Sequence, residues 1–282
     1  MTAIVILKNS LRYTLLVLLA LAAIGPFLWL LSTALKSPGE NIFAYPPQWL
    51  PQHPTLQNFV AAWQKVPMGS FFFNSLVVTA LTIAANLFLS VLTAYPLARM
   101  NFTGRPLTMF IVLASMMIPF QVLMIPMYLI CMKIGLTDTY GWLNGWLGLT
   151  APFAMSGFGV FFVRQALVTL PKELEESAVL DGCNSLQTLW HVLLPLIRPT
   201  LATLAVFSFM TAWGEFLWPN IILSDPNHFT LSVGLIRLQS AFSADWKLIA
   251  AGTLISILPI IVFFLALQRY FISGATAGSV KG

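Results

Sequence analysis

The chain has 282 residues, of which 58% are hydrophobic and only 8% charged, with a formal net charge of +5 and a mean hydropathy of +0.85. A soluble domain usually carries about 25% charged residues, so this chain has too few charges to cover a water-facing surface. The same composition excludes a disordered chain. With 2 cysteines and 17 glycines, it is neither a disulfide-rich nor a collagen-like scaffold. We therefore expect a membrane protein with several spans.

Long stretches without charged residues predict where the membrane is crossed. A bilayer core of roughly 30 Å needs about 20 apolar residues in a helix. The predicted fold is all-α, with six transmembrane helices at 13–34, 71–95, 107–130, 141–163, 200–223 and 248–268. These runs are continuous and too long for the alternating strands of an outer-membrane barrel.

The distribution of Lys and Arg predicts the topology. With six spans, nine of the 14 Lys and Arg residues lie on the side of the two termini, and the richer side should be cytoplasmic. We expect no nucleic-acid partner and both termini in the cytoplasm. The predicted segments are 1–35 with the first span, an extracytoplasmic loop at 36–70 with a short helix near its end, a core at 71–269 and a tail at 270–282.

The segment between Arg164 and Arg198 differs from the spans because it is charged and helical in character. Leu170-Pro171 is typical of a helix start, and the glutamates that follow lie where the helix dipole favours anions. Asp181-Gly182 predicts the end of that helix, since glycine accepts a left-handed conformation. A second short helix should follow and end at Pro195. The sequence thus predicts a helical hairpin on the cytoplasmic side.

This hairpin admits two interpretations: a solvated interfacial element, or a docking element for another protein. Leu174 and Ala178 stand four residues apart and share a helix face, which Val179 widens. A small residue at position 178 would let a partner approach closely. The flanking carboxylates would then meet basic groups on that partner.

The residues of the hairpin resemble a known motif. Glu176-Ser177-Ala178, followed by Gly182 and then by Leu194-Pro195, looks like the EAA motif of ABC-importer permeases, in which Glu-Ala-Ala is followed at fixed offsets by Gly and Leu-Pro. Ser177 departs from the usual alanine but is also small. The match is specific because it joins several fixed spacings.

Other stretches extend the resemblance to the maltose-importer type of permease over nearly the whole chain. They are Asn74-Ser75, 94–99, Ile118-Pro119, 135–139, 213–216 and 268–271. The resemblance implies a type I ABC-importer permease fold, a bacterial inner-membrane location and a role in carbohydrate uptake. Its implied partners are a second permease subunit, two ATP-binding subunits, an extracytoplasmic solute-binding protein and membrane lipid.

We expect this chain to have no catalytic residues, no metal site and no cofactor of its own. None of its seven lysines follows a glycine, as a Walker A phosphate loop requires. ATP and magnesium would be bound by the partner ATPase subunits. The resemblance makes residues 172–187 a coupling helix seated in a cleft of the ATPase. The implied coupling residues are Leu174, Glu176, Ala178, Asp181, Gly182, Leu194 and Pro195.

Polar and aromatic side chains in the predicted spans are candidates to line a sugar path, because aromatic faces suit the C–H surfaces of sugars. The candidates are Gln121, Asn144, Ser156, Thr211, Trp213, Glu215 and Asn220. Glu215 is the only acidic residue inside a predicted span, and such groups usually face a cavity or a protein partner. The alternative is a helix bend near Pro219, where Glu215 would be solvated from outside.

Other functions remain open at this point. The same architecture could import glycerol phosphate, amino acids or peptides, although an anionic substrate would favour Arg or Lys inside the spans, where none lies. A secondary transporter often shows repeats and paired acidic residues, which are not evident. A membrane enzyme is disfavoured, since the three histidines are scattered and no HExxH or GxSxG motif occurs.

The C-terminal stretch 275–282 is small and polar. It is either a frayed end or, as the resemblance suggests, a segment that inserts beside the ATPase subunits.

Overall fold

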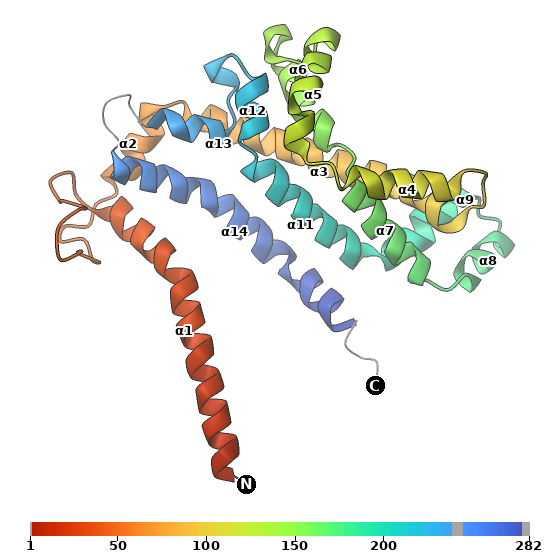
Figure 1. Cartoon of the computed structure of the whole chain (residues 1–282), viewed down its shortest axis with the longest axis horizontal. Helices are drawn as coiled ribbons and strands as arrows, with labels where there is room; N and C mark the ends of the chain where they lie inside the picture. Colours follow the sequence, from red (N-terminus) through yellow and green to blue (C-terminus); the bar gives the residue numbers. More distant parts are fainter. Residues whose placement is uncertain (1, 239–244, 278–282) are drawn as a thin grey trace. The chain divides into compact units, whose positions relative to one another are not determined.

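The computed structural model describes residues 2–238 and 245–277, and all regular elements within these ranges are helices (Figure 1). By length and composition, four stretches could each cross a bilayer, and two bent helix pairs bring the number to six if each pair is one span. The four stretches are Asn9–Leu35, Met68–Arg99, Phe120–Tyr140 and Trp246–Gln268. The all-α fold is therefore confirmed, and the upper count equals the six spans predicted from the charges.

The chain divides into two compact units, Met1–Met68 with Leu235–Leu258 and Gly69–Gly234 with Pro259–Gly282. The helices of the second unit are α3 (Met68–Arg99), α4 (Arg105–Ser115), α5 (Phe120–Ile134), η1 (Asp138–Tyr140), α6 (Trp142–Thr150), η2 (Ala151–Phe153), α7 (Gly157–Thr169), α8 (Glu173–Leu180), α9 (Ser185–Gln187), η3 (Thr188–Leu193), α10 (Leu194–Leu196), α11 (Arg198–Gly214), α12 (Leu217–Ile222), η4 (Pro226–His228), α13 (Leu231–Gly234) and the end of α14 (Trp246–Ala277). Since α14 reaches Ala277, the predicted tail at 270–282 is helical as far as that residue. Residues 278–282 lie outside the described ranges.

The expected span at 107–130 is not one helix, so this prediction is wrong. α4 ends at Ser115 and α5 begins at Phe120, after a break that contains Pro119. Proline has no backbone N–H and disfavours a helical conformation in the residue before it. The helix therefore starts afresh at Phe120.

The expected span at 141–163 is a bent pair of helices. Trp142–Phe153 and Gly157–Thr169 meet at an angle of 57°. At the bend, Ser156 caps α7, because its Oγ accepts a hydrogen bond from the backbone N–H of Gly159 at 2.9 Å. This cap satisfies one of the free N–H groups at the start of the helix.

The expected span at 200–223 is interrupted as well, and the helix before it is longer than predicted. α11 stops at Gly214 and α12 starts at Leu217. The preceding helix does not end at Pro195 but continues to Leu196, and it then bends by 81° into α11. Its π-helical turn, η3, widens the helix directly before the proline. This wider turn accommodates a ring that would collide with the preceding carbonyl in a regular α-helix.

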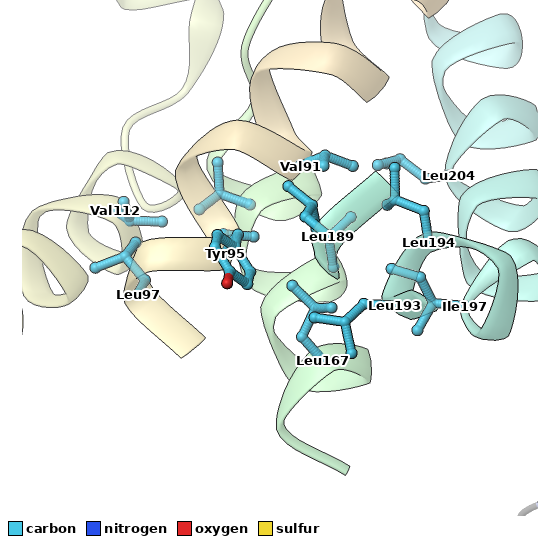
Figure 2. Packing of buried hydrophobic residues seen from close by; sticks show 13 residues of the cluster. Val91, Tyr95, Leu97, Val112, Leu167, Leu189, Leu193, Leu194, Ile197 and Leu204 are labelled. Atoms are coloured by element: carbon cyan, nitrogen blue, oxygen red, sulfur yellow. The ribbon is translucent and has the colours of Figure 1, made fainter. Parts of the chain in front are cut away.

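A hydrophobic cluster joins α3, α4, α7, η3, α10 and α11 (Figure 2). Its fully buried members include Leu167 from α7 and Leu189 and Leu193 from η3. Tyr95 and Leu97 contribute from the last turns of α3. Because close packing is specific in shape, this cluster fixes the bent helices against the end of α3.

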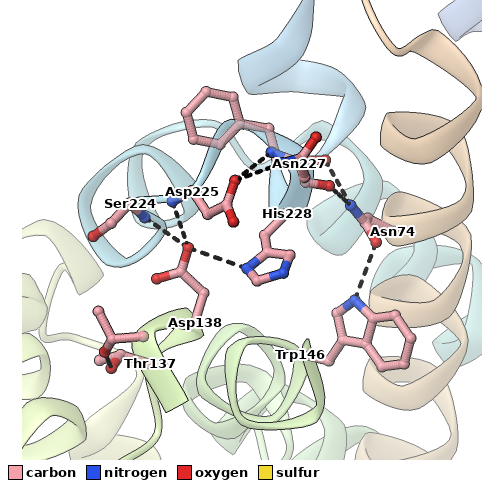
Figure 3. A network of polar contacts seen from close by, with 10 residues as sticks. Asn74, Thr137, Asp138, Trp146, Ser224, Asp225, Asn227 and His228 are labelled. Carbon is pink, nitrogen blue, oxygen red and sulfur yellow. Dashed lines mark hydrogen bonds and ion pairs between the residues drawn. The ribbon is translucent and has the colours of Figure 1, made fainter. Parts of the chain in front are cut away.

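A polar network holds the other end of α3 and the loop before α13 (Figure 3). The buried Asp138 accepts hydrogen bonds at Oδ2 from the backbone N–H groups of Ser224 and Asp225, both at 2.8 Å, and lies 3.4 Å from His228 Nδ1. Asn74 of α3 donates to two carbonyl groups of the same loop at 3.0 and 3.1 Å. These bonds replace the water that the buried backbone groups would otherwise need.

The first unit comprises α1 (Thr2–Leu35), α2 (Gln57–Lys65), η5 (Leu235–Leu238) and the first part of α14. The short helix expected near the end of the outer loop is thus present. Three lysines of this unit donate to backbone carbonyls: Lys36 to Gln48 at 2.8 Å, Lys65 to Leu238 at 3.1 Å, and Lys247 to Ser37 and Pro38 at 2.7 Å each. Lys36 is fully buried. Because a buried ammonium group must be hydrogen-bonded, the bonds of the buried Lys36 and Lys247 fix the loop that follows α1.

Glu40 is the centre of the loop that follows α1. Its two carboxylate oxygens accept hydrogen bonds from the backbone N–H groups of Ser37, Gln52 and His53 and from the Ser37 hydroxyl, all at 3.1 Å. Loss of water around the carboxylate would raise the pKa of Glu40, but these hydrogen bonds outweigh that effect and lower the pKa from 4.5 to about 2.

This lowered pKa predicts a pH dependence for the loop. A carboxylate whose pKa falls on folding stabilises the folded loop fully above its ordinary pKa, and the stabilisation is lost as the pH falls from 4.5 toward about 2. We expect hydrogen exchange at the amides of Gln52 and His53, corrected for intrinsic rates, to accelerate across this window. In the Glu40→Gln variant, the same amides should exchange faster at neutral pH and show no further change over the window. Equal protection in both proteins would contradict this role.

Candidate functional site

A tight left-handed turn ends α8 and reverses the chain. Gly182 has φ +84°. The backbone N–H of Cys183 donates to the carbonyl of Ala178 at 2.9 Å, and that of Gly182 to Val179 at 3.0 Å, which is the Schellman arrangement. A Cβ atom at Gly182 would meet nothing within 4 Å. The turn therefore needs glycine for its backbone conformation and not for space.

The second helix of the hairpin begins with a reciprocal cap. Asn184 Oδ1 accepts from the backbone N–H of Gln187 at 2.9 Å, and Gln187 Oε1 accepts from that of Asn184 at the same distance. This capping box satisfies two free donors at once. With the Schellman turn before it, the connection between the two helices is hydrogen-bonded on both sides.

The exposed face of α8 differs from the face that spacing suggested. Ala178 is only 5% exposed, and Leu174 is half-buried. The exposed apolar side chains are instead Val179, at 65%, and Leu180, at 88%. They form a shallow groove of about 380 Å³ with Glu175 and Glu176. Ala178 is small so that α8 can pack closely on its own chain, which corrects the expectation that Leu174 and Ala178 form the outer docking face.

The predicted coupling residues at the base of the hairpin are part of the protein core. Leu194 belongs to the hydrophobic cluster of Figure 2, beside Leu193 and Ile197. Pro195 is half-buried next to it, whereas Asp181 is exposed at the turn. The base of the hairpin is therefore packed against the other helices of the second unit, whereas its tip and one face of α8 are exposed.

Sequence reasoning missed two residues that hold α8 in place. Arg99, the last residue of α3, forms an ion pair with Glu175, with Nε and Oε1 at 2.6 Å. The Nε–H is not aligned as a regular hydrogen bond, so the contact is mainly electrostatic. The Arg99 guanidinium also donates to the carbonyl of Leu170 at 2.8 Å.

A cavity of about 610 Å³ lies between α3, α7, α11 and the α4–α5 break. Its polar lining consists of hydroxyl and amide groups, from Thr82, Asn86, Ser115, Ser156, Ser208 and Thr211. Phenylalanines 120, 153, 158 and 207 also line it. None of the described residues that line this cavity is charged.

Asn86 and Ser156 connect two walls of the cavity. Asn86 Nδ2 donates to Ser156 Oγ at 3.1 Å, and Ser90 Oγ donates to Asn86 Oδ1 at 2.8 Å. Gly159 lies against this group: a Cβ there would come within 2.4 Å of Ser90 Oγ and 2.6 Å of Asn86 Oδ1. The absence of a side chain at Gly159 thus allows α7 and α3 to approach closely.

Only two of the predicted path residues, Ser156 and Thr211, line this cavity. Gln121 and Asn220 are exposed elsewhere on the chain. Asn144 donates to the carbonyl of Tyr140 at 3.2 Å. Trp213 is buried and stacks on Phe209. The cavity also has members that no sequence pattern indicates, Asn86 among them, because their positions depend on how α3 packs against α7.

Glu215 lies in the break between α11 and α12. Its Oε1 accepts a hydrogen bond from the backbone N–H of Trp218 at 3.1 Å, and its backbone carbonyl accepts one from the Ser232 hydroxyl at 2.6 Å. It borders a much smaller cavity of about 10 Å³ with Pro219. This geometry matches the helix-bend alternative.

Within residues 2–238 and 245–277, no three His, Cys, Asp or Glu side chains gather as around a metal ion.

Comparison with known proteins places the chain in a family. The family of binding-protein-dependent transport system inner membrane components matches residues 86–276. The arabinooligosaccharides transport system permease protein AraQ of Bacillus subtilis is 37% identical over 212 residues, which cover 75% of this chain and 73% of AraQ. The diacetylchitobiose uptake system permease protein DasC of Streptomyces coelicolor is 32% identical over 268 residues, covering 94% and 95% of the two chains.

The melibiose/raffinose/stachyose import permease protein MelC of Bacillus subtilis is 32% identical over 271 residues and 94% of each chain. Among solved structures, a bacterial ABC transporter involved in the import of the acidic polysaccharide alginate matches with a TM-score of 0.81 at 24% identity. This match covers 94% of our chain and 96% of that chain, so the two share a fold. With the family match spanning most of its length, the chain belongs to the binding-protein-dependent transport system inner membrane components, the permease subunits of ABC importers.

Proposed function

We propose that this permease forms half of the pathway of an ATP-driven importer for neutral saccharides, and that α8 couples it to an ATPase subunit. The observation that carries the proposal is the hairpin. Glu176, Val179 and Leu180 are exposed on a helix whose turn is hydrogen-bonded on both sides and whose base is packed in the core. An exposed apolar face beside a carboxylate suits a protein partner with a basic rim.

A neutral sugar is the substrate class that the cavity suits best. Its described lining offers hydroxyl and amide groups for sugar hydroxyls and phenylalanine rings for their C–H faces, and it offers no charge. An anionic substrate would need a cationic group in the path, because a charge away from water must be paired. The names of the relatives AraQ, DasC and MelC each refer to oligosaccharide transport or uptake.

The remaining partners follow from this function. The importer would contain a second permease subunit, two ATP-binding subunits that hold ATP and magnesium, and an extracytoplasmic solute-binding protein. Both termini of this chain would lie in the cytoplasm, on the side of α8. The absence of any Gly-Lys pair from the sequence supports a separate ATPase.

Uptake measured in proteoliposomes tests this function against the secondary transporter. The probes are radiolabelled raffinose, arabinotriose and diacetylchitobiose, and the control is a complex whose ATPase carries a substituted Walker A lysine. We expect uptake of at least one probe only with the complete complex and ATP. Uptake by this chain alone, or at the same rate with the inactive ATPase, would show that it is a carrier driven by another gradient.

Gly182 provides a test of the hairpin itself. A residue with a Cβ costs roughly 1–2 kcal/mol in the left-handed conformation, and only asparagine and aspartate adopt it readily. We expect Gly182→Val to reduce ATP-dependent uptake strongly while membrane insertion stays normal, and Gly182→Asn to keep most of the uptake. Quantitative immunoblotting of membranes and uptake assays provide the two readouts. Equal uptake in the Val and Asn variants would mean that the turn conformation does not matter.

A further inference from the structure

Arginines of three helices meet at the last turn of α3: Arg99 of α3 itself, Arg105 of α4 and Arg164 of α7. Arg164 of α7 and Arg105 of α4 both donate through Nε to the carbonyl of Leu97 at 3.1 Å, and Arg105 also donates to the carbonyl of Ala98 at 3.2 Å. The last carbonyls of a helix lack partners within the helix, and cations there are favoured by the helix dipole.

These contacts compensate for a weak point in α3. Pro96 lies inside the helix, three residues before its end, and proline removes one hydrogen bond from the turn. Without other support, the turn that carries Arg99 could bend away from the rest of α3. Arg105 and Arg164 hold the carbonyls of Leu97 and Ala98, which directly follow the proline, to α4 and α7. Arg99 therefore projects from a fixed base.

Arg99 reaches from this base to the hairpin at two places. It donates to the carbonyl of Leu170, just before α8, and pairs with Glu175 within α8. The Arg99 side chain is 6% exposed and that of Glu175 is 22% exposed. A pair so shielded from water is little screened by salt. By contrast, Glu173 and Glu176 of the same helix are exposed. Glu175 is therefore the carboxylate of α8 that faces α3.

α3 connects this pair to the cavity. Thr82 and Asn86 line the cavity, and Asn86 lies 13 residues before Arg99 in the same helix, which corresponds to about 20 Å at 1.5 Å per residue. A displacement of α8 that Arg99 transmits would therefore shift a cavity wall. Coupling between distant sites needs such a rigid element, whose position both sites influence.

We propose that Arg99 and Glu175 are positioning residues for transport, which link the movement of α8 to that of α3. This inference rests on the proposed function, since it assumes that an ATPase moves α8. Neither residue contacts the substrate. Their role is to make α8 and α3 move together, so their loss should separate ATP hydrolysis from solute movement.

The test compares Glu175→Gln and Arg99→Gln with the reversed pair R99E/E175R in the complete complex in proteoliposomes. Glu173→Gln is the matched control, because it removes an exposed carboxylate from the same helix. The readouts are assembly with the ATPase, ATP hydrolysis, and the ratio of ATP hydrolysed to solute imported. We expect both single variants to assemble and to raise this ratio by roughly tenfold, within the range of site-to-site couplings. The reversed pair should recover part of the loss, and Glu173→Gln should match the wild type.

A merely structural role would give a different result. If hydrolysis and uptake fall in parallel, or if the single variants keep the wild-type ratio, the inference is overturned. Should the single variants fail to assemble, Glu175→Asp decides, since it keeps the charge but shortens the side chain by one methylene and so withdraws the carboxylate from Arg99; an unchanged ratio in that variant overturns the inference. Failure of the proposed function is recognised separately, because the wild-type complex would then import solute without its ATPase.

Discussion

The arrangement of the second unit depends on how the last turn of α3 is held. The last turn of a helix leaves carbonyl groups without partners in the helix itself, and such groups need other partners where they are shielded from water. Arg105 and Arg164 satisfy two of them, while Arg99 leaves the same turn toward α8. The apolar side chains of the cluster in Figure 2 pack around this turn. Charge and packing therefore act at one place, where α4, α7 and the hairpin all attach.

The same requirement for satisfied backbone groups explains the form of the cavity. Apolar spans are tolerated in lipid only where their N–H and C=O groups are paired, and interruptions occur where protein groups or water can pair them. Ser156 caps the start of α7, and Glu215 accepts the free N–H of Trp218 at the start of α12. The interruption at Ser156 also brings polar groups to the cavity. The breaks that make the spans irregular thus help to make the cavity polar.

Much of this could be predicted from the sequence, because it depends on residues close together in the chain. The charge-free stretches predicted six spans, which equals the upper count of candidate spans in the structure. The Gly182 turn and the hairpin followed from local patterns. The orientation of α8 could not be predicted in this way: four-residue spacing shows that Leu174 and Ala178 share a face, but not that this face packs on the chain itself. The ion pair between Arg99 and Glu175 joins residues that are far apart in the sequence. For the same reason, the sequence does not indicate that Asn86 lines the cavity or that Trp213 is buried against Phe209.

Two of the predicted helix boundaries are wrong for a local reason that the spacing of charged residues does not reveal. Pro119 interrupts the third expected span although no charge lies near it, and Pro195 does not end a helix because a π-helical turn accommodates it. Composition thus locates a span more reliably than it determines its continuity. In this permease, the discontinuities border the cavity and shape the hairpin.

The proposed coupling through Arg99 and Glu175 requires that α8 and the end of α3 move as one body when the ATPase binds ATP. Pulsed electron paramagnetic resonance can measure this in the complete complex, with spin labels at Met100 and Glu173 in a background without Cys131 and Cys183. A second measurement pairs Met100 with a label on the other permease subunit. We predict that ATP changes the second distance and leaves the distance from Met100 to Glu173 unchanged. A change in the distance from Met100 to Glu173 that accompanies ATP binding would contradict the account.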